Sequence, residues 1–380
     1  MGKRKKQQEV KYYSLDRIKE YNAQYNVIYG KRSNGKTYAT LEEGLLKYKE
    51  TRKEMAYIRR WDDDLRGKRG MTLFEPLVHN GVIAEVTDGE YDDVYYYGRC
   101  WYFMRWEESK GQRVRVKADK PFCYGFSLNT MEHDKSSSYP LVSTIIFDEC
   151  LTRGMYLNDE FIIFMNVIST IARTREDITI FMVGNSVNKY CPYFKEMGLS
   201  NVKTQKIGTI DLYRYGSSEL KVAVEYVPAS TGSTEKGNLL FAFDNPKLQM
   251  ITTGTWEIDI YPHLQYSYKP HNVVYQYFIE FDGETLHCEV IHGAYDEKGI
   301  EHKNIRFTYI HEKTTDIKDP DKDVIFSPHV DARPNHYTDL TRGIDRRSEK
   351  IAEHFKRDKV FYQNNEVGEI VNNYLKYCKQ

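Results

Sequence analysis

The stretch NVIYGKRSNGKT, residues 26–37, decides the fold that this chain is expected to adopt. An apolar run ends at Gly30, and Gly35, Lys36 and Thr37 complete the pattern Gly-x-x-x-x-Gly-Lys-Thr. The glycines let a backbone fold round a phosphate with its N–H groups pointing inward. The lysine of such a loop contacts the β- and γ-phosphates of a nucleotide, and the threonine hydroxyl binds Mg²⁺. The remaining residues of this predicted phosphate-binding loop (P-loop) are Lys31, Arg32, Ser33 and Asn34.

The surroundings of the loop are those that a P-loop needs. Residues 25–29 predict a strand, and residues 37–48 predict a helix because Leu41 and Leu45 begin an apolar stripe. A helix that begins at the loop directs the positive end of its dipole at a bound phosphate. The alternative is an ordinary glycine turn, which the order strand, loop, helix disfavours.

A second motif, STIIFDE at residues 143–149, predicts a strand that ends in two acids. Ligands of open α/β sheets bind at the carboxyl ends of the strands. We therefore expect Asp148 to hold Mg²⁺ and Glu149 to orient and polarise the attacking water. By itself this motif is weak, because acids often end a strand at the protein surface. Downstream of a P-loop it favours a nucleotide hydrolase.

The next predicted strand narrows the class of nucleotide. It ends at Asn185, which could sense the γ-phosphate, although an asparagine after Gly184 also suits a plain turn. A guanine-binding Asn-Lys-x-Asp motif is not formed, because Asn188-Lys189 is followed by Tyr190 and Cys191. An acid pair with a catalytic glutamate instead favours hydrolysis of ATP by water.

Two pairs of arginines are candidates for contact with the nucleotide. Arg59 and Arg60 end the predicted strand at residues 54–60, near the expected phosphate edge. Arg173 and Arg175 follow an apolar helix, where an arginine could reach the γ-phosphate of a neighbouring subunit and stabilise transition-state charge. The alternative for each is a solvated cation or a surface ion pair.

The composition excludes several protein classes. Lysine plus arginine equals aspartate plus glutamate, so any contact with nucleic acid must come from local patches. No run of about 18 apolar residues exists, which predicts no membrane span. The six cysteines form no C-x-x-C pair and are expected to be reduced thiols of a cytosolic protein.

The chain is expected to fold as two domains. Apolar strands separated by helical segments predict an α/β domain with a mostly parallel sheet at residues 1–205, carrying a hairpin-like insertion at about 91–128. Residues 206–249 are polar and rich in turn formers, and we expect a linker there. Residues 250–380 predict a smaller α+β domain with an Asp282-Gly283 hairpin turn and two late helices.

Five segments, in this order, resemble the DNA-packaging ATPases (encapsidation proteins) of small tailed bacteriophages of the Bacillus-phage type. The segments are VIYGKRSNGKTYA, AYIRRW, SSSYPLVSTIIFDEC, ARTRED and VGNSVNKYCPYF. The resemblance covers about residues 14–200. It implies an additional-strand catalytic-glutamate ATPase domain and a C-terminal domain like a degenerate ribonuclease-H nuclease.

The same resemblance implies a motor that drives double-stranded DNA into a preformed capsid. Its subunits form a homo-oligomeric ring of five on the portal, in the host cytoplasm and transiently at the portal vertex, and a scaffold RNA remains open as a further partner. By motif match, Arg173 falls at the trans-acting arginine of the family. Lys135 matches a lysine that acts in trans or faces DNA.

Two alternatives remain open at this stage. A terminase-like motor with an active nuclease needs several carboxylates that converge on two metals. The C-terminal candidates are Glu280, Asp282, Glu284 and Glu289. Since Asp282 is expected in a turn, we predict a binding and docking module instead. The second alternative, a P-loop kinase for a small molecule, has no need of Glu149.

Overall fold

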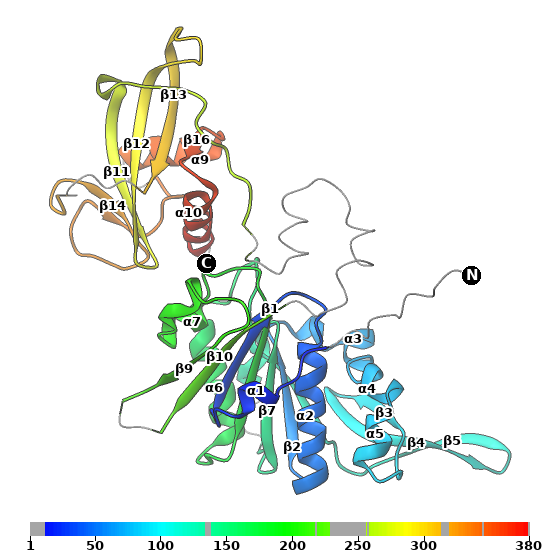
Figure 1. The fold of residues 1–380 in the computed structure, drawn as a ribbon. Coiled ribbons are helices and arrows are strands. Elements are labelled where there is room, and N and C mark those ends of the chain that lie inside the picture. The colour runs from blue at the N-terminus through cyan, green and yellow to red at the C-terminus, as the bar shows by residue number, and fades with distance from the viewer. Residues whose placement is uncertain are drawn as a thin grey trace, which may run out of the picture. The chain divides into compact units, whose positions relative to one another are not determined.

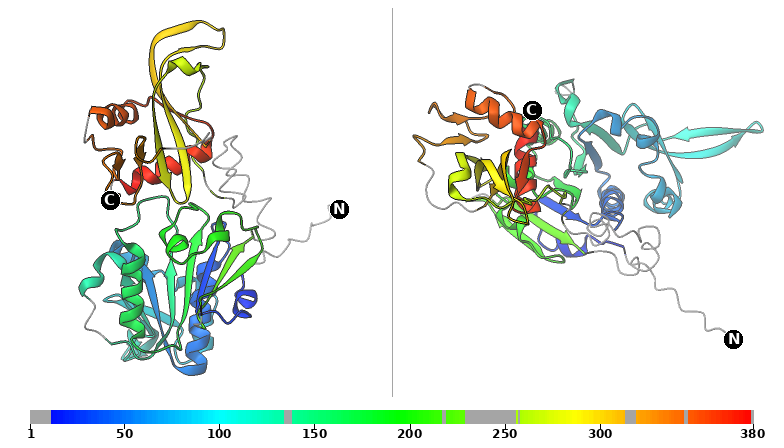
Figure 2. Two further views of the ribbon diagram at one scale, coloured as in Figure 1. Left: turned by 90° about the vertical axis from the view of Figure 1, so that its left-hand side faces the viewer. Right: turned by 90° about the horizontal axis from the view of Figure 1, so that it is seen from above.

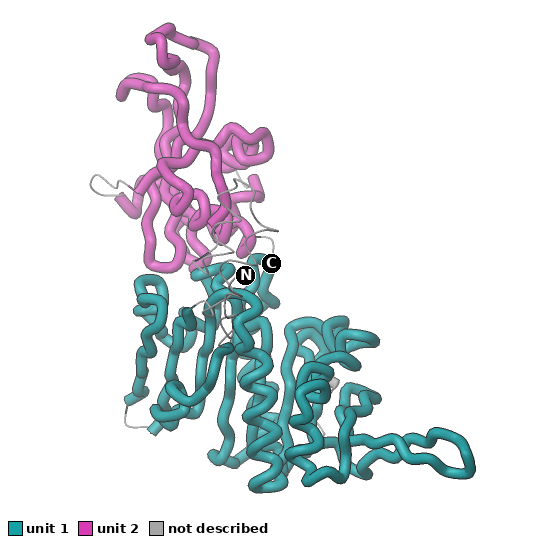
Figure 3. Tube along the Cα trace, turned by 45° about the vertical axis from the view of Figure 1, so that its right-hand side comes forward, with its two compact units in different colours: residues 1–257 teal, residues 258–380 magenta. Residues whose placement is uncertain are grey.

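The computed structural model describes residues 12–133, 138–216, 219–228, 256, 258–312, 319–343 and 346–378. The chain forms two compact units, residues 1–257 and residues 258–380 (Figure 3). None of the helices in the described part of the chain combines the length and the apolar character that a membrane span needs.

The first unit is built on a ten-stranded sheet whose central six strands are parallel (Figure 1). In spatial order these are β6 (Cys123–Ser127), β2 (Glu54–Arg59), β7 (Val142–Asp148), β8 (Thr179–Asn185), β1 (Tyr25–Gly30) and β10 (Lys221–Val227). Antiparallel strands flank this core: β9 (Ile210–Arg214) beside β10, and β4 (Cys100–Ser109) beside β6, with β3 (Asp93–Tyr97) and β5 (Gln112–Lys117) paired to β4. The predicted α/β class with a mostly parallel sheet is confirmed.

Helices cover both faces of this sheet, because its central strands are apolar on both sides. On one face Ile28 and Ile146 pack with α1 (Asp16–Lys19), α2 (Lys36–Thr51), α4 (Glu75–His79) and α5 (Val82–Val86). On the other face Val27 and Phe147 pack with α6 (Glu160–Ala172) and α7 (Pro192–Glu196). A further short helix, α3 (Gly67–Met71), lies in the connection between β2 and β3 (Figure 1).

The strand β8 lies between β1 and β7, and this order positions the site. Gly30 at the end of β1 is in register with Asn185, and Asp148 at the end of β7 is in register with Val183. The P-loop, the acid pair and Asn185 therefore meet at one edge of the sheet.

Two expectations about the first unit need correction. Residues 206–249 were expected to be a linker, but β9 and β10 within them extend the sheet, and residues 229–249 lie outside the described part. Residues 91–128 were expected to be a hairpin-like insertion, but their last strand, β6, is a parallel strand of the central sheet beside β2. In both segments the apolar residues form a strand of the sheet because they are buried beside a neighbouring strand.

Within its described residues, the second unit contains a six-stranded sheet and the α-helices α9 and α10, in agreement with the predicted α+β composition (Figure 2). The order is β15 (His336–Tyr337), β14 (Val324–Phe326), β11 (Val273–Phe281), β12 (Glu284–Tyr295), β13 (Glu301–His311) and β16 (Val360–Tyr362). The strands β11, β12 and β13 are antiparallel, whereas β14 runs parallel to β11, β15 to β14 and β16 to β13. The helices are α9 (Arg346–Lys356) and α10 (Asn365–Tyr377).

The predicted hairpin turn between β11 and β12 is confirmed. Asp282 and Gly283 both have positive φ angles, 53° and 84°. Positive φ at both central residues is the signature of the two-residue turn that matches the twist of its flanking strands.

Candidate nucleotide site

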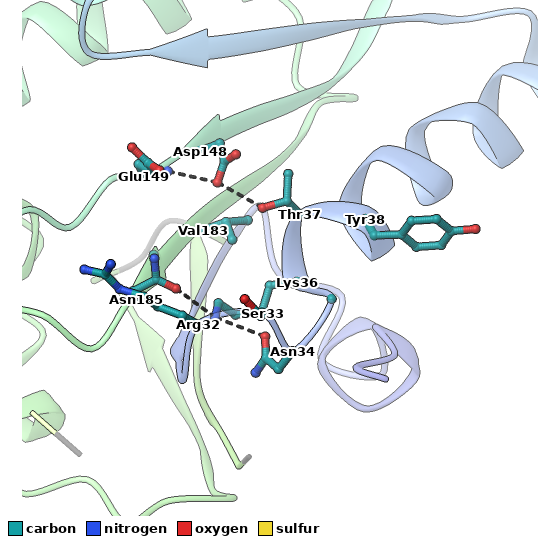
Figure 4. Close-up of a pocket in the computed structure, with 12 residues that line it drawn as sticks. Arg32, Ser33, Asn34, Lys36, Thr37, Tyr38, Asp148, Glu149, Val183 and Asn185 are labelled. Atoms are coloured by element: carbon teal, nitrogen blue, oxygen red, sulfur yellow. Dashed lines mark hydrogen bonds between the residues drawn. The ribbon is translucent and has the colours of Figure 1, made fainter. Parts of the chain in front are cut away.

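A cavity of about 420 Å³ lies where the P-loop faces the ends of β7 and β8 (Figure 4). Residues of the P-loop, of the start of α2 and of the two strand ends line it. They are Arg32, Ser33, Asn34, Gly35, Lys36, Thr37, Tyr38, Asp148, Glu149, Val183, Gly184 and Asn185. The sequence motifs thus come together in space as predicted.

The two glycines of the loop are required for different reasons. A Cβ atom at Gly30 would lie 2.5 Å from the carbonyl oxygen of Val227, so only glycine allows β1 and β10 to approach this closely. Gly35 has a φ angle of +92°, in the left-handed region that favours glycine. The loop shape that the sequence pattern predicts therefore depends on both positions.

Lys36 places its ammonium inside the loop, among neutral oxygens. Its Nζ lies 2.7 Å from the carbonyl oxygen of Lys31, 3.1 Å from Oδ1 of Asn34 and 3.4 Å from Oδ1 of Asn185. The residue is only 4% exposed, and burial lowers the pKa of its amine to about 8, against the opposing effect of Asp148. A buried cation without a full counter-charge is suited to an anionic ligand.

Asn34 adds a second feature of the same kind. The residue is buried, and its side-chain Nδ2 has no hydrogen-bond partner among the described residues. A buried donor without an acceptor is costly. Together with Lys36, this donor fits a phosphate held in the loop.

Thr37 and Asp148 lie opposite each other, as expected of two residues that bind the metal ion of a bound nucleotide. The Thr37 hydroxyl donates to Oδ1 of Asp148 over 3.1 Å. The described residues contain no group of three or more metal-ligating side chains. The hydroxyl and the carboxylate that lie together here fit Mg²⁺, which prefers oxygen ligands and binds one or two protein groups together with substrate phosphates and water.

Tyr57 is a site residue that the sequence did not reveal. Its buried hydroxyl donates to Oδ2 of Asp148 over 2.8 Å, and burial raises the pKa of this phenol well above its usual value. The sequence could have indicated Tyr57 only through its spacing, because a residue two positions before Arg59 points to the same side of β2.

Glu149 is held by an ion pair rather than presented freely to the pocket. Its Oε2 lies 2.6 Å from Nη2 of Arg59. The same Nη2 lies 3.3 Å from Oδ2 of Asp64, and Nη1 of Arg59 lies 3.5 Å from Oδ2 of Asp148. A second cavity of about 600 Å³, partly lined by Arg59 and Arg69, borders the same acid pair. Arg59 is therefore in contact with the predicted catalytic acid, on the side away from the P-loop.

Arg60 does not line the pocket, contrary to our expectation. Its Nε donates to Oε2 of the buried Glu160 over 2.8 Å, and its other nitrogens donate to the carbonyl oxygens of Glu149 and Cys150. The Tyr193 hydroxyl donates to the other oxygen of Glu160. Arg60 thus positions the segment after β7, because the alternation along β2 turns it away from Arg59.

Asn185 lines the pocket beside Lys36, whereas Arg173 does not lie there. The helix α6 begins beyond the acid end of β7 and leads back to the start of β8, so Arg173 at its end lies at the opposite edge of the sheet. Arg175 donates to the carbonyl oxygens of Val142 and Tyr139, over 2.6 and 3.0 Å. Lys135 lies outside the described residues.

The C-terminal carboxylates do not converge. Asp282 and Glu284 lie at the hairpin turn between β11 and β12, and Glu280 precedes it on β11. Glu289 accepts a hydrogen bond from Tyr268 and lies 3.3 Å from Nε2 of His311.

Comparison with known proteins identifies the relatives of this chain. Residues 94–250 match the family model described as Podovirus DNA encapsidation protein (Gp16). The chain is 26% identical over 182 residues to the DNA packaging protein of Bacillus phage B103, and 25% identical over 186 residues to that of Bacillus phage phi29. The predicted resemblance to phage DNA-packaging proteins is confirmed. These alignments cover 47% and 48% of this chain and 49% of each relative, so they span about half the length of these packaging proteins.

Two solved phage packaging motors share the fold of this chain. A chain of the bacteriophage Phi-29 viral genome packaging motor assembly matches with a TM-score of 0.55 at 19% identity, covering 97% of this chain and 99% of that one. A chain of the Phi-28 gp11 DNA packaging motor matches with a TM-score of 0.51 at 18% identity, covering 97% and 98%. The P-loop lies before the span of the encapsidation family model, so its assignment rests on the geometry of the pocket.

Proposed function

We propose that this chain is the ATPase of a motor that moves double-stranded DNA into a preformed capsid, as a homo-oligomeric ring at the portal. The observation that carries the proposal is that Lys36, Thr37, Asp148, Glu149 and Asn185 all line one pocket. The likeness to DNA packaging proteins supports DNA as the substrate that is moved.

Five side chains of the pocket and the backbone of the P-loop have roles in hydrolysis. The backbone N–H groups of residues 30–37 and the ammonium of Lys36 hold the phosphates of ATP, and Asn185 contacts the γ-phosphate. Thr37 and Asp148 would hold Mg²⁺, which when bound would neutralise charge on the phosphate oxygens. Glu149 accepts a proton from the attacking water once its carboxylate has left Arg59, and Arg59 thus keeps the acid inactive until then.

The position of β8 between β1 and β7 supports the additional-strand catalytic-glutamate class of P-loop ATPases. In the second unit, three antiparallel strands followed by β14 and β15 beside β11 have the strand order of ribonuclease-H folds. Because no metal-binding cluster occurs among the described residues of this unit, we assign it binding and docking, with the portal and a scaffold RNA as candidate partners.

The test is the rate of ATP hydrolysis with and without double-stranded DNA, at protein concentrations that span ring assembly. We expect a rate that rises with DNA and with assembly, and that is lost in Lys36→Ala and Asp148→Asn. A rate indifferent to DNA but dependent on a small-molecule acceptor would assign a kinase instead. Nicking of plasmid DNA with Mn²⁺ would assign an active nuclease.

A further inference from the structure

The strands β3, β4 and β5 form an arm with an aromatic and cationic face. Beyond Met104 only the pairing of β4 with β5 continues, as a two-stranded ribbon that extends away from the rest of the first unit (Figure 1). We call the following residues the arm face: Tyr95, Tyr102, Trp106, Arg113, Arg115 and Lys117.

Each cation of the arm face lies over an aromatic ring. The guanidinium of Arg113 is 4.9 Å from the ring centre of Trp106, and that of Arg115 is 4.4 Å from Tyr95. The ammonium of Lys117 is 4.4 Å from the ring centre of Tyr102. Such contacts contribute about 0.5–1 kcal/mol each at exposed sites and so favour defined positions of these long side chains.

The three cations are exposed, and within the described residues no carboxylate forms an ion pair with any of them. Glu108 lies opposite Arg113 across the ribbon, yet the two form no ion pair. By contrast, Arg105 on the other face of β4 pairs with Glu107. In a chain of zero formal net charge, the arm face is thus a local excess of positive charge.

We propose that the arm face binds the phosphate backbone of double-stranded DNA. Arg113, Arg115 and Lys117 are alternate residues of one strand, so they follow each other at intervals of about 6.7 Å along a line. A two-stranded ribbon also fits the major groove of a DNA duplex. Stacking of unpaired bases would need open aromatic rings, but a cation already lies over each of Tyr95, Tyr102 and Trp106 and leaves less of these rings open. The choice of DNA rests on the proposed function.

The test measures binding of the full chain to a labelled DNA duplex without nucleotide, over a range of salt. We expect the triple variant Arg113→Gln, Arg115→Gln, Lys117→Gln to bind about tenfold more weakly at low salt, with the slope of log affinity against log salt reduced by about 2 to 3. Its basal ATP hydrolysis should be unchanged, because the arm face is distant from the P-loop in the fold.

Two matched variants separate local from general effects. The triple variant Lys19→Gln, Lys49→Gln, Lys53→Gln removes the same charge from lysines that pair with Glu43, Asp88 and Asp177, and should bind DNA as the parent does. The variant Arg113→Lys, Arg115→Lys, Lys117→Arg keeps the charge and should also keep the affinity, which separates charge from folding of the ribbon.

An unchanged affinity and slope in the glutamine variant would overturn the proposal, as would equal losses in the lysine control. Tighter binding of single-stranded DNA or duplex RNA than of duplex DNA would refute the choice of ligand. If the parent binds DNA through the arm but hydrolyses no ATP, the proposed motor function fails while this inference stands.

Discussion

At the scale of single residues, the charge of Lys36 links nucleotide binding to pH. Burial lowers the pKa of this amine to about 8, and a bound phosphate would stabilise its charged form. We therefore expect ATP binding near pH 8 to take up roughly half a proton, and ATP affinity to fall as the pH rises above 8. Calorimetry in buffers of different ionisation enthalpy measures this uptake.

The control for this prediction is Lys36→Arg, whose guanidinium stays charged throughout this pH range. Any ATP binding that remains in this variant should take up no proton at position 36. If the variant takes up as many protons as the parent, a group other than Lys36 titrates. The sign for stability is opposite. Because the unfolded chain holds this proton up to higher pH, Lys36 makes folding more favourable as the pH rises from about 8 toward its usual value.

Glu149 should be needed for hydrolysis but not for binding. The change Glu149→Gln keeps the shape of the side chain and loses the charge that polarises water. We expect near-normal ATP affinity with hydrolysis slower by about 10²-fold or more. Single-turnover hydrolysis and nucleotide binding measured on the same preparation check this. Normal turnover in the variant would remove Glu149 from the mechanism.

The two arginines at the end of β2 show which site residues can be assigned from the sequence and which cannot. The P-loop pattern fixed the positions of Lys36 and Thr37, and the acid pair was found from its place after an apolar run. Nothing local distinguishes Arg59 from Arg60, because alternation states only that they point to opposite sides. The buried Glu160, which binds Arg60, is distant in sequence and decides between them.

At the scale of elements, the close contact between β1 and β10 is what shapes the P-loop. Gly30→Ala would bring its Cβ to 2.5 Å from the carbonyl oxygen of Val227 unless one strand moves. We expect a loss of about 1–3 kcal/mol in the free energy of unfolding, together with weaker ATP binding. Thermal or denaturant unfolding and nucleotide titration measure the two effects.

Gly81→Ala is the matched control, because Gly81 has a φ angle of +75° but no atom within 4 Å of the added Cβ. It carries the cost of backbone strain alone, about 1 kcal/mol, and should leave ATP affinity unchanged. Equal effects of the two changes would show that crowding against β10 is unimportant.

The contact with β10 was also the part of the sheet that the sequence predicted least well. Val222, Ala223 and Val224 are buried beside β1, but the segments around them are polar and turn-rich. A short apolar run in such surroundings predicts neither a linker nor a sheet strand by itself. This segment becomes a sheet strand because it pairs with β1, almost 200 residues earlier in the chain. Such a long-range contact leaves no pattern in the local sequence.

At the scale of the whole molecule, the proposed ring requires that unlike edges of two copies meet. Arg173 lies at the edge of the sheet where β8 begins, whereas the P-loop and Asp148 lie at the edge where β1 and β7 end. These edges are separated by the length of α6, about 20 Å for 13 residues. A head-to-tail contact, which closes into a ring, can bring Arg173 of one subunit to the P-loop of the next.

Complementation between two inactive variants tests this arrangement. Alone, Arg173→Ala should bind ATP but hydrolyse it poorly, because a trans-acting arginine contributes about 10³-fold or more in related chemistry. Mixed with Lys36→Ala, it should regain activity at sites where an intact P-loop meets an intact Arg173 of the next subunit. In random rings mixed in equal amounts, about one interface in four has this composition.

A mixture of Lys36→Ala with Asp148→Asn is the control, because both residues line the same pocket of one subunit. No interface in those rings contains a complete site, so their activity should not exceed the sum of the two variants. If mixed rings of Arg173→Ala and Lys36→Ala form and are equally inactive, Arg173 does not act in trans. Because Arg175 already binds backbone carbonyl oxygens at the start of β7, the test would then pass to Lys135.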